Sequence, residues 1–318
     1  MLPKHLQRIA IITPALAEAN NGNWQTAKRW SFFLDKAFKI EVSKTLDTNL
    51  VLFDALIGLH ARRSAAAIKE FSATNKPIAV VLTGTDLYGD TPDHIEVRES
   101  LELAQRIVVL QDDALKLVPQ QFKNKTEVIY QSASVRKPGP FRQRTFDIAF
   151  VGHLRAVKDP MTVLRAMSSL DLPQIRLIHI GKTDEYEKEF TQAVLSDARI
   201  ESKGPLPHNE TRQTLGKCRL MVISSIMEGG ANVVIEALTN ETPVLASRMS
   251  GNIGMLGNDY PGYFEVSDHE GLANLIKRCV EDQSFLELLR KYGARRSSRF
   301  YPATEKRAVL QLAHKLLK

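Results

Sequence analysis

Two glutamates flank a glycine pair in the segment SSIMEGGANVVIEAL, which covers residues 224–238. Glu228 directly precedes Gly229 and Gly230, and Glu236 follows eight positions after Glu228. Glycines at a turn let the backbone approach a ligand closely and adopt positive φ. The first N–H groups and the positive dipole end of a following helix attract an anion such as a diphosphate. The segment therefore predicts an anion-binding turn with a carboxylate on either side.

The spacing of the two carboxylates suits an elongated ligand. Glu236 is expected to lie two helical turns below Glu228, about 12 Å along the axis at ~1.5 Å per residue. That separation is comparable to the distance from the sugar to the ribose of a nucleotide sugar. A buried carboxylate can accept hydrogen bonds from both ribose hydroxyls, while Glu228 meets the transferred sugar. The same residues equally fit a plain helix N-terminus with a surface glutamate.

Short apolar runs alternate with helix-like segments and must position this turn. In the first half these runs cover residues 8–13, 55–59, 78–83, 106–110 and 127–130. After a linker rich in proline and glycine at residues 137–140, they cover residues 146–151, 175–180, 220–224 and 243–246. Such a pattern predicts parallel sheets covered on both faces. We expect an α/β protein of two Rossmann-like domains facing across a cleft, with ligands at the carboxyl ends of the strands.

Three segments follow from this pattern. Residues 1–138 form the expected N-terminal acceptor domain, and residues 139–300 form the expected C-terminal donor domain. Residues 301–318 have a helical pattern, with Thr304 as a candidate N-cap after Pro302, and are expected to return to the N-terminal domain.

Bulk composition favours a soluble cytoplasmic protein. The 318 residues are 43% hydrophobic and 25% charged, which is typical of a globular protein. The two cysteines, Cys218 and Cys279, form no CxxC pattern and suit a reducing compartment. The N-terminal apolar run is too short for a membrane span and lacks a signal-peptide pattern. The net charge of +7 fits scattered surface cations or anionic small substrates, and no basic–aromatic stripe indicates nucleic acid.

Several motifs resemble those of GT-B glycosyltransferases of the family 4 type. The E-x7-E spacing, the later segment ETPVLAS and the opening of the second domain, FVGHLRAVKDP, carry this resemblance. Members of the family typically have a G-R-L-x-x-x-K segment whose arginine and lysine neutralise the donor diphosphate. Lys158 matches the lysine, whereas His153 occupies the arginine position and Arg155 lies two residues further on. The resemblance implies that Arg155 supplies the missing charge.

A narrower resemblance concerns the selenosugar synthases, the glycosyltransferases of selenoneine biosynthesis. It rests on NNGNW, LHARRSAAAI, LTGTDLYGD, GHLRAVKDP, MEGGANVVIEAL and NDYPGYF, which follow one another between residues 20 and 264. It implies that selenophosphate is coupled to UDP-GlcNAc or UDP-glucose, giving a 1-selenosugar, UDP and phosphate. The product would pass to a later enzyme of that pathway. An ordinary hexosyltransferase with a lipid or saccharide acceptor, and a non-catalytic nucleotide-sugar-binding protein, are the alternatives.

The resemblance also assigns donor-binding residues. Glu236 is expected to hold the ribose and Glu228 the sugar. The diphosphate is expected to meet Lys158, Arg155 and the backbone of four consecutive residues, Gly229, Gly230, Ala231 and Asn232. From the N-terminal domain, Gly22 and Asn23 are expected to approach the donor phosphate, unless Asn21-Gly22 is only a tight turn. Backbone groups of GPLPHNE, residues 204–210, are expected to meet the uracil, with little dependence on side-chain identity.

The acceptor is a compact anion and therefore needs cations and N–H donors. Two segments after predicted strands offer them, and the residues are His60, Arg62, Arg63, Ser64, Thr83, Gly84 and Thr85. Two arginines at a helix entry can cradle an oxyanion; the alternative is that one is solvated and the other pairs with a nearby carboxylate. Asp86 is expected either to orient the acceptor or transfer a proton when the phosphate leaves, or to serve only as an N-cap or Asx-turn residue. The same two interpretations apply to Asp90.

The residues expected to take part in catalysis are Glu228, Asp86, Arg63 and Lys158. No cluster of histidine, cysteine or acidic residues has metal-binding spacing in the sequence, so we expect no cofactor and transfer without a metal. Stable membrane association and nucleic-acid binding are not expected. Tyr260, Pro261 and Tyr263 are expected to pack, and His179 is expected to be a core histidine.

Overall fold

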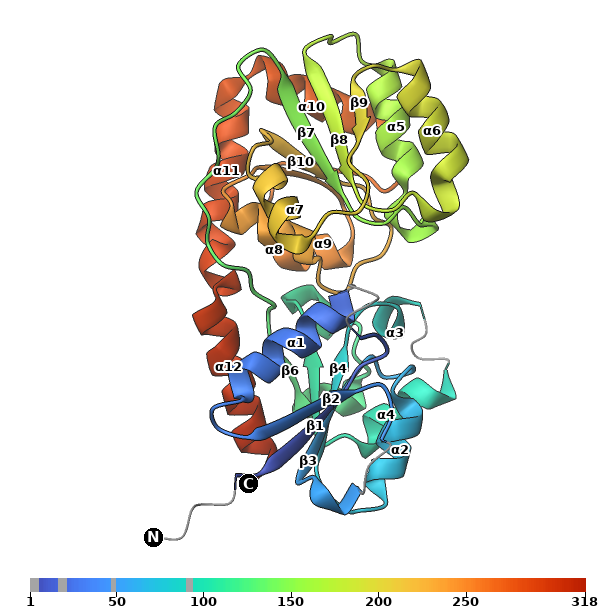
Figure 1. The fold of residues 1–318 in the computed structure, drawn as a ribbon, viewed down its shortest axis with the longest axis vertical. Helices are drawn as coiled ribbons and strands as arrows, with labels where there is room; N and C mark the ends of the chain where they lie inside the picture. Colours follow the sequence, from blue (N-terminus) through green and yellow to red (C-terminus); the bar gives the residue numbers. More distant parts are fainter. Residues whose placement is uncertain (1–5, 17–21, 47–49, 90–93) are drawn as a thin grey trace. The chain divides into compact units, whose positions relative to one another are not determined.

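The computed structural model describes residues 6–16, 22–46, 50–89 and 94–318 (Figure 1). The chain divides into two compact units: unit 1 contains residues 1–131 and 302–318, and unit 2 contains residues 132–301. The first boundary falls shortly before the proline- and glycine-rich segment at residues 137–140. The C-terminal helix α12 (Pro302–Leu316) belongs to unit 1.

Unit 1 is built on a six-stranded parallel sheet with the order β2-β1-β3-β4-β5-β6. Its strands are β1 (Arg8–Ile12), β2 (Lys39–Ser43), β3 (Ala55–Leu59), β4 (Ile78–Leu82), β5 (Arg106–Val109) and β6 (Thr126–Val128). Its helices, besides α12, are α1 (Gly22–Leu34), α2 (Ala65–Ser72), α3 (Thr85–Tyr88) and α4 (Ile95–Leu103), with short 3₁₀ turns η2 (Leu50–Leu52), η3 (Asp112–Lys116) and η4 (Gln120–Lys125).

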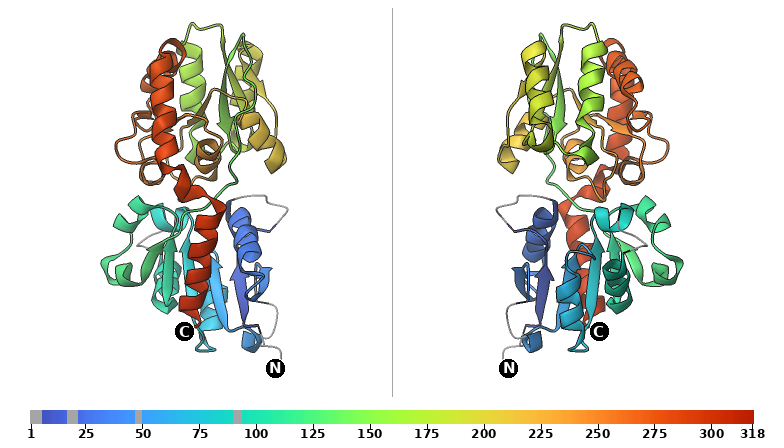
Figure 2. Two further views of the ribbon diagram at one scale, coloured as in Figure 1. Left: turned by 90° about the vertical axis from the view of Figure 1, so that its left-hand side faces the viewer. Right: turned by 90° about the vertical axis from the view of Figure 1, so that its right-hand side faces the viewer.

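The core of unit 1 has two halves, one on each face of this sheet. Alternate residues of a strand point to opposite faces, so Leu56 packs with α2 and α4, whereas Ile57 packs with α1 and α12. Figure 2 shows α12 running along the sheet of unit 1. Its docking is fixed by Glu305, whose buried carboxylate accepts hydrogen bonds from Trp30 Nε1 at 2.8 Å and Arg29 Nε at 2.7 Å.

Unit 2 contains a second six-stranded parallel sheet with the order β12-β11-β10-β7-β8-β9. The strands are β7 (Phe146–Val151), β8 (Ile175–Ile180), β9 (Ile200–Ser202), β10 (Leu220–Ile223), β11 (Val244–Ser247) and β12 (Tyr263–Phe264). The helices are α5 (Pro160–Ser169), α6 (Glu187–Ser196), α7 (His208–Leu215), α8 (Asn232–Thr239), α9 (Ser250–Leu256), α10 (His269–Glu281) and α11 (Gln283–Ser297), and the 3₁₀ turns are η5 (Ala156–Lys158), η6 (Asp184–Tyr186) and η7 (Ser298–Phe300).

Each sheet has one point where the strand order reverses. In unit 2 the chain runs from β7 outward to β8 and β9, and then returns to the other side of β7 with β10. The loops after β7 and β10 therefore lie side by side at the carboxyl ends of neighbouring strands, which is where open α/β sheets bind ligands. In unit 1 the corresponding neighbours are β1 and β3.

The predicted fold class, an α/β protein of two Rossmann-like halves, is confirmed by these two sheets. All nine predicted strands are present within one or two residues of their expected ends. Three strands at sheet edges, β2, β9 and β12, were not predicted. Among the described residues, no helix is long and apolar enough to cross a membrane.

Two local predictions about helix starts are wrong. Helix α8 begins at Asn232, so Glu228 precedes it and the distance of two helical turns between the two glutamates does not apply. Helix α12 begins at Pro302, so Thr304 lies inside its first turn and does not cap it. Proline at the first helical position needs no N–H partner, which explains this earlier start.

Candidate functional site

A lysine and a glutamate meet at the switch point of unit 2. Lys158 ends the 3₁₀ turn after β7, and Glu228 lies in the turn between β10 and α8. Lys158 Nζ forms an ion pair with Glu228 Oε1, and Ser225 Oγ donates to the same oxygen at 2.7 Å. The two ionic side chains are only 19% and 13% exposed. The structure thus brings together two residues that were predicted for different parts of the donor, and their direct ion pair was not predicted.

The loops that carry this pair are tied to each other. Ser224 Oγ donates to the carbonyl oxygens of Lys158 at 2.7 Å and Asp159 at 2.9 Å. The N–H of Ile226 donates to Val157 O at 2.9 Å. A Cβ added at Gly251, on α9, would lie 2.1 Å from Glu228 O. The Glu228 turn is therefore held by contacts on two sides and depends on glycine at position 251.

The turn before α8 fits the predicted anion-binding geometry. Ala231 is the N-cap residue and no side chain caps it. The hydrogen bonds from Val234 N and Ile235 N both reach Ala231 O, so the amides before Val234 are the first-turn donors of the helix. Gly229 is buried, whereas Gly230 and Asn232 are half-buried. These amides can bind an anion, as the sequence predicts for residues 229–232.

Glu236 lies on α8 and is not a surface residue. It is 7% exposed, and its Oε1 is 2.9 Å from Nε2 of His208, the first residue of α7. On the same helix α7, Arg212 is 1% exposed and donates to Thr239 Oγ1 at 3.0 Å and Asn240 Oδ1 at 2.5 Å. Burial lowers the pKa of Arg212, while the charge of Glu236 raises it in part.

His153 occupies the sequence position of the family's arginine, but one of its ring nitrogens is already hydrogen-bonded to the backbone. Its Nδ1 accepts a hydrogen bond from the Lys182 N–H at 3.0 Å. Desolvation lowers its pKa, and the cations Lys182, Arg155 and Lys158 lower it further, against an opposing effect of Asp184. Arg155 is exposed on the same loop. A neutral His153 beside an exposed Arg155 agrees with the prediction that Arg155 supplies the charge, which stays a prediction.

His179 supports this loop from below. It is fully buried, lies between Phe150 and Phe190 with ring centroids 5.8 and 4.6 Å away, and its Nε2 is 3.0 Å from Gly152 O. The prediction of a core histidine is confirmed. Tyr260 packs as predicted too, because it is 3% exposed and its hydroxyl donates to Val244 O at 2.6 Å.

In unit 1, the loops after β3 and β4 bring the predicted acceptor residues together. His60 has a left-handed φ of 72° and is 2% exposed, and its Nε2 is 2.9 Å from Thr85 Oγ1. Ser64 is also buried, and its hydroxyl donates to Leu59 O at 2.6 Å. Both side chains therefore shape the loop. Their contact with an acceptor stays a prediction.

Asp86 connects the two loops. It is fully buried, and its carboxylate accepts hydrogen bonds from the N–H groups of Ala61, Thr83 and Gly84 at 2.8 to 2.9 Å. The carboxylate thus satisfies backbone donors of both loops, which favours a structural role for Asp86 over contact with the acceptor or proton transfer. The other residue with the same interpretation, Asp90, lies outside the described residues.

The exposed groups at this end of unit 1 are Arg62, Arg63 and the Thr85 side chain, with Thr83 and Gly84 half-buried between them. The two arginine side chains are thus exposed, and guanidinium groups can bind an anion, whereas the Thr85 hydroxyl is hydrogen-bonded to His60. Gly22 and Asn23 form the start of α1, where Thr26 Oγ1 donates to Gly22 O at 2.8 Å. Asn21, the first residue of the alternative tight turn, lies outside the described residues.

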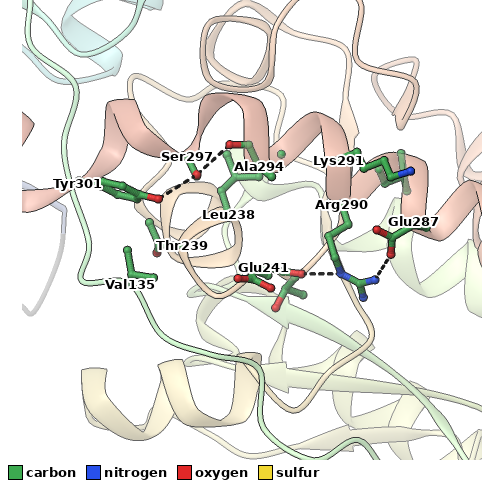
Figure 3. Close-up of a pocket in the computed structure, with 13 residues that line it drawn as sticks. Val135, Leu238, Thr239, Glu241, Glu287, Arg290, Lys291, Ala294, Ser297 and Tyr301 are labelled. Carbon is green, nitrogen blue, oxygen red and sulfur yellow. Dashed lines mark hydrogen bonds and ion pairs between the residues drawn. The ribbon is translucent and has the colours of Figure 1, made fainter.

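A cavity of about 420 Å³ lies elsewhere in unit 2, at the C-terminal end of α8 (Figure 3). Leu238 lies in its middle, Tyr301 and Ser297 at one end, and Arg290 and Glu287 at the other. Arg290 Nε donates to Glu241 O at 3.2 Å, which joins α11 to the turn after α8. None of the predicted site residues lines this cavity, so it is separate from the switch-point site.

No group of three or more histidine, cysteine or acidic residues in the described part of the chain could hold a metal ion. Two site residues were not predicted. His208 lies in GPLPHNE, where only backbone contacts were expected, and Ser225 immediately precedes the IMEGG turn. A polar residue at the start of a helix beside the ligand edge of the sheet was the available signal for His208.

Comparisons with known proteins agree with this geometry. Residues 131–296 match the family of glycosyl transferases group 1. The whole chain is similar in fold to HepE of Anabaena in complex with UDP-glucose, with a TM-score of 0.77, 17% identity and coverage of 98% of this chain and 100% of that one. Sucrose-phosphate synthase of Thermosynechococcus elongatus gives a TM-score of 0.81, 16% identity and coverage of 98% and 99%. A glycosyltransferase of Rickettsia africae gives a TM-score of 0.70 and 14% identity, with coverage of 98% of this chain and 99% of that one.

Proposed function

Because the chain belongs to the glycosyl transferases group 1 family, we propose that it transfers the sugar of UDP-GlcNAc or UDP-glucose to selenophosphate. The products would be a 1-selenosugar, UDP and phosphate, as in selenoneine biosynthesis. Selenium would form a bond to the anomeric carbon while the bond from that carbon to the UDP oxygen breaks. Water would then cleave the Se–P bond and release phosphate.

The observation that carries the donor half is the Lys158–Glu228 pair, followed on α8 by the buried Glu236. A lysine, the N-terminus of a helix and two carboxylates lie at one switch point, in an order that matches diphosphate, sugar and ribose. HepE, whose fold is similar, was solved with UDP-glucose. We therefore assign UDP-sugar binding to unit 2.

The Lys158–Glu228 pair suggests how the donor is received. A diphosphate is a stronger partner for Lys158 than one carboxylate, so its arrival would draw Lys158 toward the phosphates. Glu228 would then accept hydrogen bonds from the sugar hydroxyls, while Ser225 Oγ keeps its hydrogen bond to the Glu228 carboxylate. Lys158, Arg155 and the amides of residues 229–232 would stabilise the negative charge that develops on the leaving UDP.

The acceptor half rests on the exposed Arg62 and Arg63 in unit 1 and on the resemblance stated above. Selenophosphate is already nucleophilic through selenium, so it needs charge stabilisation more than a strong base. The buried Asp86 and His60 would keep the loops in place, and Arg63 and Thr85 would contact the anion. We further propose that no metal is required, because protein groups supply the charge stabilisation.

Product analysis tests this proposal. The purified full-length protein would be mixed with a chelator, UDP-GlcNAc or UDP-glucose and fresh selenophosphate, and the products identified by mass spectrometry. The proposal predicts a selenosugar that forms together with UDP, only when the protein, the UDP-sugar and selenophosphate are all present. If UDP bound but no selenosugar formed, selenophosphate would be excluded as the acceptor, and a lipid or saccharide acceptor would be favoured. Turnover that appears only when a divalent cation replaces the chelator would refute metal independence.

A further inference from the structure

The imidazole of His208 covers the carboxylate of Glu236. His208 Nε2 lies 2.9 Å from Glu236 Oε1, which is a hydrogen-bonding distance. The His208 side chain is 51% exposed, whereas that of Glu236 is 10% exposed. The ring therefore lies on the solvent side of the carboxylate, where a ligand of Glu236 would arrive.

The position of His208 is fixed by the helix on which it lies. Arg212 follows it by one helical turn on α7 and is buried against the end of α8. Arg212 donates to Thr239 Oγ1 and Asn240 Oδ1, and Asn240 Nδ2 donates back to Arg212 O at 3.0 Å. Because these bonds join α7 to α8 next to Glu236, the two elements that carry His208 and Glu236 are held together by buried polar contacts.

A carboxylate oxygen has two lone pairs, so Glu236 can accept from His208 and from a ligand hydroxyl at once. The hydrogen bond to His208 selects one orientation of the carboxylate before any ligand binds. Fixing a binding group in advance improves affinity because less conformational freedom is lost on binding. The orientation also decides which pair of vicinal hydroxyls can reach both oxygens.

We propose that His208 is a positioning residue that prepares Glu236 to recognise the two ribose hydroxyls of the nucleotide, and so makes the protein selective for ribonucleotide donors. This inference rests on the proposed UDP-sugar binding by Glu236. The proposed role differs from that of a simple surface ion pair, which would contribute little to the stability of the protein. His208 acts on the nucleotide through Glu236, and the selectivity follows from the 2′-hydroxyl.

Calorimetric titration of His208→Ala with UDP and with 2′-deoxy-UDP tests the inference. For UDP we expect the Kd of the variant to rise about ten-fold, because Glu236 is no longer held in one orientation before the ligand binds. For 2′-deoxy-UDP, the variant is expected to lose less affinity than for UDP, since only one of the two hydroxyls that use the oriented carboxylate remains. His208→Gln, which retains an N–H donor, is expected to restore UDP affinity to within about three-fold of wild type. In turnover, KM for the donor should rise with kcat nearly unchanged.

His94→Ala is a matched control, because His94 in unit 1 is also a partly exposed histidine beside a glutamate, Glu96, at 3.4 Å. Its UDP affinity should equal that of wild type, and all variants should keep their melting temperature. An equal loss for UDP and 2′-deoxy-UDP in His208→Ala would overturn the inference, since His208 would then act directly on the base or phosphates. Unchanged UDP affinity in that variant would overturn it too, while the proposed function would stand. Failure of the wild type to bind UDP would refute both.

Discussion

Lys158 and Glu228 are 70 positions apart in the sequence and form an ion pair because β7 and β10 are neighbours in the sheet. Both side chains are mostly removed from water, and Ser225 adds a hydrogen bond to the carboxylate. Loss of one partner from such a pair leaves the other charge without compensation. The pair is therefore sensitive both to mutation and to any ligand that offers Lys158 a second anion.

Lys158→Ala should reduce kcat/KM for the UDP-sugar by about 100-fold, because a cation at the leaving diphosphate is removed. Release of UDP in a steady-state assay measures this effect. Lys188→Ala removes an exposed lysine from α6 in the same unit and should leave kcat/KM within about two-fold of wild type. Equal activities of the two variants would show that Lys158 does not act on the donor.

Arg63→Ala should leave the Kd for UDP unchanged and raise KM for selenophosphate about ten-fold, because a charge-assisted bond to the acceptor is lost. Calorimetry and initial rates measure the two quantities separately. Arg62→Ala provides the comparison between adjacent exposed arginines. If Arg63→Ala left selenophosphate kinetics at the wild-type level, the acceptor assignment would move to Arg62 or away from this loop.

Asp86→Ala should lower the free energy of unfolding of unit 1 by about 3 kcal/mol, because three backbone N–H groups lose their acceptor. Both tryptophans of the chain, Trp24 and Trp30, lie in α1, so tryptophan fluorescence during urea unfolding reports on unit 1. Asp35→Ala, at an exposed position of the same unit, should change stability by less than about 0.5 kcal/mol. A loss of activity in Asp86→Ala without a loss of stability would instead indicate a direct chemical role.

Unit 2 should lose stability in mild acid. Burial lowers the folded-state pKa of His179 below the ordinary histidine value of 6.5, so its contribution to stability is complete above that value and is lost as the pH falls through the lowered pKa. His153, whose pKa is also lowered chiefly by burial, adds to the same trend. Hydrogen exchange of backbone amides in β7 and β8 between about pH 7.5 and pH 5 measures the change, after correction for intrinsic rates.

His179→Gln retains a donor for Gly152 O but does not titrate in this range. Its stability should therefore fall less with decreasing pH than that of wild type. A pH dependence as steep as in wild type would assign the acid sensitivity to His153 or to carboxylates and not to His179.

The central strands were predictable because they are buried on both faces and read as continuous apolar runs, such as IAVVL in β4. The edge strands β2, β9 and β12 were missed for the converse reason. The sequence of β2 is KIEVS, half polar and without a fully buried residue, and β9 and β12 contain only three and two residues. Their pairing is set by the neighbouring strand, and their own residues give a weak signal.

In the candidate site of unit 2, the closeness of the loops that carry Lys158 and Glu228 could be predicted, because each loop follows a central strand and the two strands are neighbours. The role of His208 could not, because its contact with Glu236 depends on how α7 packs on α8. In unit 1 the positions of His60 and Asp86 were correct, but their burial was not foreseen. Polar residues at a turn give no sign of whether they face a ligand or the neighbouring loop.

The strand order of unit 2 has a consequence for its folding. Strands β7, β8 and β9 can pair in the order in which they are synthesised, but β10 must return past them to reach β7. Such non-local pairing is a slow step in folding, because a long loop must close before the contact forms. Glu228 follows β10, so it meets Lys158 only after this step. A nascent chain that ends before β10 lacks Glu228, so the Lys158–Glu228 pair forms only once the sheet of unit 2 has gained this strand.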